Sequence, residues 1–324
     1  SGDIADIRAM SGFDVKVDAA ANKSWHNGGN RSASPPLTMP PFHLSASLRD
    51  IPQGYRVDDL ALTVAGSDVV ASLQILRTGS RFRVTGKASA PLIDLARMSP
   101  PTGSSVRPAG TGELSKATNL WQLADADLQL SFGRLVLNDG RELQAGSGRF
   151  ELESGRLKST ALEVTVGGAK VKLAGSVVEP HALAGLDLKV AVQGQELAEL
   201  SKFFGRSIAP VGPYQAQARI GGSFSALNIS GLDASACRAA QNVRVRGQID
   251  DANNLRGVQL ALNAKLTDTV AAGRLFGIDL PRLPAAKVST KFRVMDRNYV
   301  FDDVQLVLGR TSVSGRIALL PGEP

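Results

Sequence analysis

The sequence predicts a mostly β fold, an elongated and repetitive antiparallel sheet with a few short helices. Aliphatic residues alternate with polar ones along one stretch after another, which is the period of a half-buried strand. Glycine-marked turns separate these stretches. The chain has 324 residues, of which 33 are Gly and 16 are Pro, and only 5% are aromatic. This composition suits short strands and turns better than an aromatic-rich enzyme core.

The alternation places aliphatic side chains on one face of each predicted strand. Clean one-sided alternation is typical of an antiparallel sheet with one shielded face and one wet face. The other positions carry many Ala and Thr residues, so the sequence leaves open which parity of each strand is shielded. The candidate apolar-face residues are Leu60, Leu62, Val64, Leu73, Ile75, Leu128, Leu130, Phe132, Leu162, Val164, Val166, Leu186, Leu188, Val190, Val258, Leu260, Leu262, Val304, Leu306 and Leu308.

Short turns and three helical segments complete the local prediction. The turns at Asn138–Gly140 and Gly167–Gly168 fit tight hairpins, so consecutive strands are expected to be neighbours. Helical spacing is found at Leu92, Leu95 and Met98, and in two further segments. These two segments are Glu196–Phe204 and Asp268–Phe276.

The chain also repeats itself imperfectly. The segments Tyr55–Gly66, Gly155–Gly167 and Tyr299–Gly309 each combine a short strand, an alternating run and a closing Gly. A weaker fourth copy begins near Leu227. The copies are unevenly spaced, which indicates a degenerate repeat rather than a regular solenoid.

Two segments without periodicity suggest how the chain is organised. Residues 19–41 form a Pro/Gly-rich loop inside an N-terminal β-segment of residues 1–98, and residues 99–118 form a linker or a disordered loop. Residues 119–324 then form a second β-segment. The alternative is one continuous sheet that joins residues 42–98 to residues 119–324.

No recognised catalytic, metal or nucleotide motif occurs in the sequence. The three histidines are isolated, and the acidic pairs Asp58–Asp59, Asp250–Asp251 and Asp302–Asp303 are predicted to be turn and edge residues. The net charge of +7 comes from scattered Lys and Arg residues, and no nucleic-acid-binding module is present. We therefore expect a protein that is not an enzyme, has no cofactor or metal, and binds no nucleic acid.

Several segments resemble the C-terminal region of the AsmA-like family, which is related to the TamB and bridge-like lipid-transfer proteins. The stretch Leu120–Gly140 resembles a family strand with the pattern Leu-x-x-x-Asp-Ala-Asp-Leu-x-Leu, and its matching part is Asp125–Leu130. The stretch Gly155–Gly175 has the family's Gly-x-Leu pattern and ends in Gly. The helical segment Glu196–Phe204 followed by Pro210–Pro213 is also similar. The resemblance is best over residues 110–320 and weaker over residues 42–98.

The resemblance implies an envelope protein of Gram-negative bacteria, located in the periplasm and tethered to the inner membrane. Relatives form a curved sheet with an apolar concave face, as an open groove or a taco-like closure, and take part in phospholipid movement between the membranes. The chain begins at Ser1 without an initiator Met, so a membrane anchor outside this sequence is expected.

Two functions are therefore considered. The first is a groove that binds and conducts phospholipid acyl chains, supports outer-membrane homeostasis and works with envelope-protein partners. The second is a non-enzymatic assembly or scaffold factor for outer-membrane biogenesis whose sheet edges pair with partner strands.

Overall fold

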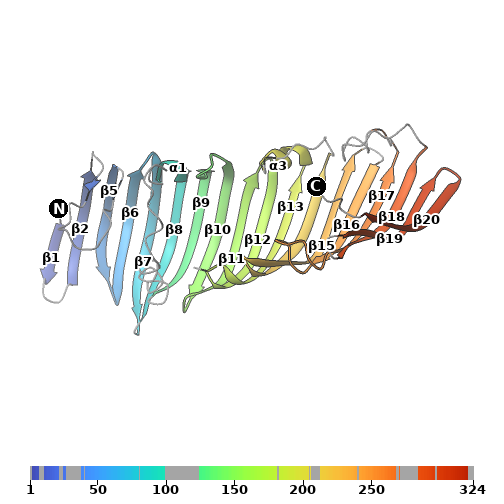
Figure 1. Ribbon diagram of the computed structural model, residues 1–324. Coiled ribbons are helices and arrows are strands. Elements are labelled where there is room, and N and C mark those ends of the chain that lie inside the picture. Colours follow the sequence, from blue (N-terminus) through green and yellow to red (C-terminus); the bar gives the residue numbers. More distant parts are fainter. Residues whose placement is uncertain are drawn as a thin grey trace. The chain divides into compact units, whose positions relative to one another are not determined.

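A computed structural model describes residues 2–6, 11–21, 25–26, 38–39, 41–79, 81–98, 124–180, 182–203, 205, 212–238, 241–267, 270, 284–295 and 298–319. Within these residues, eighteen strands belong to one sheet, and the predicted mostly β, antiparallel fold is confirmed (Figure 1). Contacts divide the chain into two compact units, unit 1 (Ser1–Val164) and unit 2 (Thr165–Pro324). The boundary falls inside strand β11 (Arg156–Val166).

Unit 1 is a meander in which most strands pair with the next strand along the chain. Its sheet strands pair in the order β1–β2–β5–β6–β7–β8–β9–β10, and β3 pairs with β4 in a separate hairpin. The strands are β1 (Gly2–Asp6), β2 (Ser11–Ala21), β3 (Trp25–His26), β4 (Thr38–Met39), β5 (Phe42–Ile51), β6 (Gly54–Val64), β7 (Ser67–Thr78), β8 (Arg81–Asp94), β9 (Ala124–Val136) and β10 (Glu142–Glu153).

Unit 2 is an antiparallel meander throughout its described strands. Each strand from β12 to β19 pairs with its successor. The strands are β12 (Ala169–Glu179), β13 (Ala184–Gly194), β14 (Tyr214–Ser223), β15 (Ala226–Arg238), β16 (Gln241–Ile249), β17 (Gln259–Leu266), β18 (Ala286–Met295), β19 (Asn298–Leu308) and β20 (Thr311–Leu319).

One strand pair departs from the predicted antiparallel meander. Strands β8 and β9 run parallel, with twelve register pairs from Phe82↔Ala124 to Asp94↔Val136. A parallel pair needs a crossover connection rather than a hairpin, and the predicted linker at residues 99–118 occupies that position in the chain. Residues 99–118 lie outside the described residues, so their linker role stays a prediction. The sheet nevertheless continues from the strands before this segment to those after it.

Two of the three main repeat copies, and the weaker fourth copy, contain a β-bulge inside a strand. In β6, β15 and β19 one extra residue is inserted relative to both neighbouring strands. At each bulge one residue has a positive φ: Asp59 (51°), Gly231 (59°) or Asp303 (50°). Two of the acidic pairs predicted to be turn and edge residues therefore lie within strands, and this prediction was wrong for them. A bulge changes the direction of the side chains that follow it. Val57 and Leu60 therefore point to the same face of the sheet, although they are three positions apart.

The bulge geometry predicts different effects on stability for two substitutions at Asp59. A β-branched residue is strongly disfavoured at positive φ, whereas Gly adopts it freely. We expect Asp59→Val to lower the free energy of unfolding by about 1–2 kcal/mol. Asp59→Gly is expected to leave it within about 0.5 kcal/mol of the parent. Denaturant unfolding of both variants measures this, and equal losses would contradict the assigned backbone conformation.

Two of the three predicted helices are present and shorter than predicted. Strand β8 continues through Asp94, and only α1 (Leu95–Met98) is helical. Helix α3 (Leu197–Phe203) matches the second prediction. Of the third segment the structure describes only Val270, which is helical. None of the helices in the described part of the chain is long and apolar enough to cross a membrane.

Both helices lie beside a Gly-containing turn between two strands. The Asp94 amide, next to α1, donates a hydrogen bond to the fully buried Ser67 hydroxyl (2.9 Å), just after the β6–β7 turn. A Cβ atom on Gly167, in the β11–β12 turn, would lie 2.8 Å from the Glu199 carbonyl oxygen of α3. Strand β2 ends at Ala21, so the predicted loop at residues 19–41 starts with three strand residues. Much of the rest of that loop lies outside the described residues.

Candidate functional site

In unit 1, the strand register places the predicted aliphatic residues on one face of the sheet. Paired residues in a sheet point to the same side, so the pairs Leu62↔Val69 and Gly86↔Leu128 extend one face across β6 to β9. We call this the apolar face of unit 1. Its larger members are Val57, Leu60, Leu62, Val64, Leu73, Ile75, Val84, Leu128, Leu130, Phe132 and Phe150.

In unit 2, the register again gathers the predicted residues on one face. Leu188 pairs with Ile220, and Leu262 pairs with Val245 and Thr290. This apolar face of unit 2 includes Leu173, Leu186, Leu188, Val190, Ile220, Ile229, Val245, Leu260, Leu262, Val288, Phe292, Phe301, Val304, Leu306 and Leu308. Val258 precedes β17 and is buried. Leu162, Val164 and Val166 alternate along β11 and so share one face of that strand.

The apolar faces are only half covered. Among the predicted residues, Val166 and Val258 are buried, Leu130 is 38% exposed, and the others are intermediate. The buried apolar side chains of the described residues lie mainly towards strand ends: Ala90, Leu152, Val166, Ala169, Val177, Ala198, Tyr214, Val258, Ala286 and Val300. The middle of each face therefore carries partly exposed leucine and valine side chains.

A cavity opens on the apolar face of unit 1 beside the β5–β6 turn. It has a volume of about 520 Å³ and is lined by Tyr55, Ile75 and Phe82, with Arg77 at the same level of the sheet. The size falls within the range of small-molecule sites, and the lining also contains the polar side chains of Asp50 and Gln53.

The opposite, polar face of each unit is held together by cross-strand ion pairs. In unit 1, Arg149 on β10 forms a bidentate pair with Asp127 on β9 (2.7 and 2.9 Å), and Arg81 contacts Asp125. These arginines hold the pKa of both aspartates below its ordinary value, chiefly through hydrogen bonds to the carboxylates. The two faces therefore differ sharply in chemistry.

In unit 2, one of these ion-pair groups centres on Asp233. Its carboxylate accepts hydrogen bonds from Arg244 (2.6 and 2.8 Å) and from Arg246 (3.3 Å) on the next strand. The Arg244 hydrogen bonds lower the Asp233 pKa to about 2. Similar pairs join Arg219 to Asp187, and Arg293 and Arg316 to Asp302.

The lowered Asp233 pKa predicts an acid-dependent contribution to stability. Its folded-state pKa of about 2 lies below the ordinary value of 3.8, so its contribution is present above pH 4 and lost as pH falls through about 2. We expect Asp233→Asn to remove this part of the pH dependence of the unfolding midpoint. The difference between the parent and the variant should shrink as pH falls from 4 to 2. A difference that stays constant with pH would contradict the assignment.

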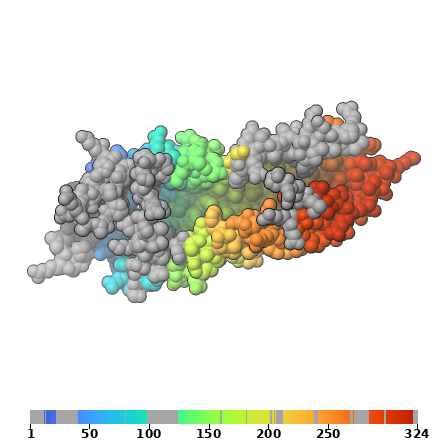
Figure 2. Space-filling model, viewed as in Figure 1, coloured from blue at the N-terminus to red at the C-terminus, as the bar shows by residue number. Residues whose placement is uncertain are grey.

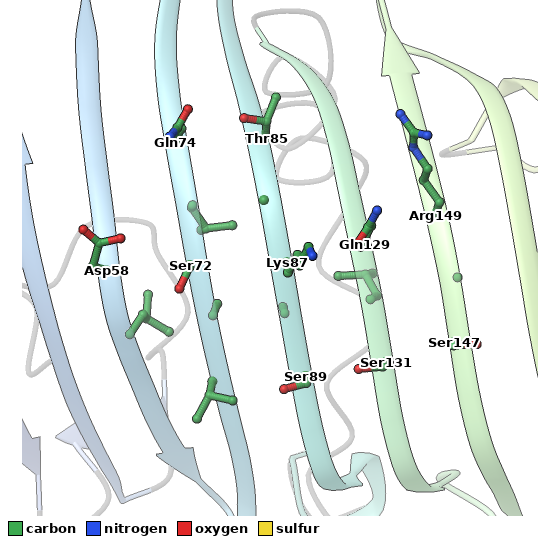
Figure 3. A pocket seen from close by; sticks show the side chains of 18 of the residues that line it. Asp58, Ser72, Gln74, Thr85, Lys87, Ser89, Gln129, Ser131, Ser147 and Arg149 are labelled. Carbon is green, nitrogen blue, oxygen red and sulfur yellow. The ribbon is translucent and has the colours of Figure 1, made fainter. Parts of the chain in front are cut away.

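Sequence reasoning missed a depression in unit 1 that is lined by both polar and apolar residues (Figure 3). The depression measures about 1260 Å³. Its side chains form cross-strand rows, because Lys87 pairs in register with Ser72 and Gln129, and Gln129 pairs with Arg149. A second row contains Ser89, Ser131 and Ser147. The polar positions between the predicted aliphatic residues were the available signal, but the rows depend on strand register.

Two polar side chains are buried on the apolar face of unit 2. The Thr290 hydroxyl donates a hydrogen bond to the Asp302 carbonyl oxygen at the β19 bulge (3.0 Å). The Tyr214 hydroxyl has no hydrogen-bond partner among the described residues, although Tyr214 is only 8% exposed. The fold thus supplies a hydrogen-bond partner for the buried Thr290 hydroxyl, but the described residues supply none for the Tyr214 hydroxyl.

Strand β20 forms an open edge of unit 2, where all nine of its residues are exposed. Its apolar row comprises Val313 (55% exposed), Ile317 (49%) and Leu319 (52%). Figure 2 shows the C-terminal strands, coloured red, at one end of the view. Among the described strands β20 pairs only with β19, so no other described strand lies beside its outer backbone groups.

The described residues contain no group of three or more His, Cys, Asp or Glu side chains that could hold a metal ion. No protein-family model, curated protein or solved structure matches this chain.

Proposed function

We propose that this protein binds phospholipid acyl chains on its apolar faces and conducts them between the inner and outer membranes. The proposed role is non-enzymatic and supports outer-membrane homeostasis. The protein would work in the periplasm, tethered to the inner membrane by a segment outside this sequence, with envelope proteins as further partners. The resemblance to AsmA-like proteins supports the proposed location and the proposed role in lipid movement.

The separation of the two faces is the observation that carries the proposal. In unit 2, ion pairs occupy one side of the sheet, and partly exposed aliphatic residues occupy the other. A contiguous apolar surface in contact with water is unfavourable and typically marks an interaction surface. Acyl chains would cover it without requiring specific polar contacts.

Apolar burial gives the proposed affinity its magnitude. At about 25 cal/mol per Å² of buried apolar area, covering 200 Å² of the leucine and valine surface contributes about 5 kcal/mol. Because this term is non-directional, neighbouring positions along the face offer similar binding free energies. A chain could therefore move from one position to the next without a deep trap, which conduction requires.

Native mass spectrometry of the purified protein, followed by organic extraction and lipid analysis, tests the proposal. We expect bound diacyl phospholipids with mixed headgroups. A protein that carries no lipid, and that takes up none from vesicles of phosphatidylethanolamine and phosphatidylglycerol, would overturn it.

The exposed β20 edge favours a second candidate function, pairing with a strand of a partner protein. Edge strands that lack protection by Pro, charge or a bulge are templates for strand addition, and β20 carries one charged residue, Arg316, already paired with Asp302. Photocrosslinkers placed along β20 in the native envelope distinguish the two. A crosslinked partner protein together with a lipid-free interior would favour the assembly role.

A further inference from the structure

The unpartnered Tyr214 hydroxyl lies at the border of the apolar face of unit 2. Tyr214 is the first residue of β14, and its strand continues along the same face with Ala216, Ala218 and Ile220. Tyrosine hydroxyls that are buried in proteins usually find a hydrogen-bond partner. This one has none among the described residues, so a phenylalanine would fill the same space without the cost of an unmade bond.

The surroundings of the ring are built to hold it in this place. Tyr214 pairs in register with Gly194 on β13. A Cβ atom on Gly194 would lie 2.6 Å from the ring and 2.7 Å from the hydroxyl oxygen, so only Gly leaves room for the ring. Burial, and secondarily the nearby Glu199 of α3, raise the pKa of the hydroxyl. The hydroxyl therefore keeps its proton and is available as a donor.

We propose that Tyr214 donates a hydrogen bond to an acceptor oxygen at the polar end of a bound acyl lipid. The inference rests on the lipid-binding function proposed above. The polar end would lie beside α3, and the acyl chain would extend over Ala218 and Ile220. Because the hydroxyl is fully covered, α3 or the ring must shift to admit the ligand, and this shift is part of the proposal.

Helix α3 is the short element whose movement would admit the ligand. It has seven residues, and the Glu196 carboxylate before it accepts hydrogen bonds from the amides of Ala198 (3.4 Å) and Gly212 (3.2 Å).

Tyr214→Phe tests the inference, and Ser131→Ala, which also removes a hydroxyl, is the control. Ser131 is exposed and lies on the polar face of unit 1, away from the proposed lipid surface. We expect Tyr214→Phe to raise the unfolding midpoint of the lipid-free protein, because it removes an unsatisfied polar group. Retention of diacyl phosphatidylglycerol, measured by native mass spectrometry, should fall about fivefold, the loss of one neutral hydrogen bond. The control should change neither quantity.

A dialkyl ether phosphatidylglycerol, which lacks ester carbonyls, identifies the acceptor. If only the diacyl lipid is lost from Tyr214→Phe, the acceptor is the ester carbonyl. If both lipids are lost, it is the phosphate. Equal retention of both lipids by the parent and Tyr214→Phe overturns the inference and leaves the proposed function standing. A parent protein that retains neither lipid overturns both.

Discussion

Gly247→Ala is expected to lower the free energy of unfolding by about 3 kcal/mol or more. Gly247 lies in the middle of β16 with φ of 152°, a conformation that L-residues rarely adopt. A Cβ atom there would overlap the Gln259 carbonyl oxygen on β17 and lie 2.9 Å from the Leu260 Cα atom. The strands would have to separate where Gly247 pairs with Leu260. Denaturant unfolding measures the loss.

Gly86 and Gly175 have the same environment as Gly247, so the effect should recur. Both have φ near 150° and face a partner-strand carbonyl oxygen opposite a leucine. Gly315→Ala is the matched control, because a Cβ atom there meets no atom within 4 Å. We expect that substitution to change stability by less than about 0.5 kcal/mol. Similar losses for Gly247→Ala and Gly315→Ala would contradict the close strand approach.

Leu262→Asp is expected to reduce bound phospholipid more than tenfold. Leu262 is in the middle of β17 on the apolar face of unit 2, between Val245 and Thr290. A carboxylate at this position would have to lose its hydration shell wherever an acyl chain passes, which costs several kcal/mol. Lipid extraction and native mass spectrometry of the purified variant measure the loss.

Asn263→Asp supplies the control for this substitution. Asn263 is the next residue of the same strand, points to the polar face and is exposed. The Asn263→Asp substitution adds the same charge one residue further along the strand, and the amount of bound lipid should not change. Circular dichroism must first show that Leu262→Asp keeps its strands. A folded Leu262→Asp protein with the parent's lipid content would exclude this face as the lipid site.

Alternation in the sequence predicted the faces well because it is a local property. Leu186, Leu188 and Val190 share a face in any strand, whatever that strand pairs with. The bulges were missed because one inserted residue interrupts the alternation without any composition signal of its own. Asp58–Asp59 resembles a turn in sequence, and only the pairing with both neighbours shows a bulge within β6.

Features that depend on pairing between distant segments were beyond sequence reasoning. Strands β8 and β9 pair in parallel, and a segment without periodicity separates them in the sequence. No local pattern therefore indicates whether the two strands run parallel or antiparallel. The row of Ser72, Lys87 and Gln129 exists only because three strands share one register. The unmade hydrogen bond of Tyr214 likewise depends on its place opposite Gly194.

Site-specific photocrosslinking at two adjacent residues tests the central claim most directly. A photoreactive amino acid replaces Leu188 on the apolar face of unit 2, or Lys189 on its polar face, in cells supplied with radiolabelled phospholipid precursors. Crosslinked lipid at Leu188 and none at Lys189 is the predicted result. Equal crosslinking at both positions, or crosslinking at Lys189 alone, would contradict acyl-chain binding on the apolar face.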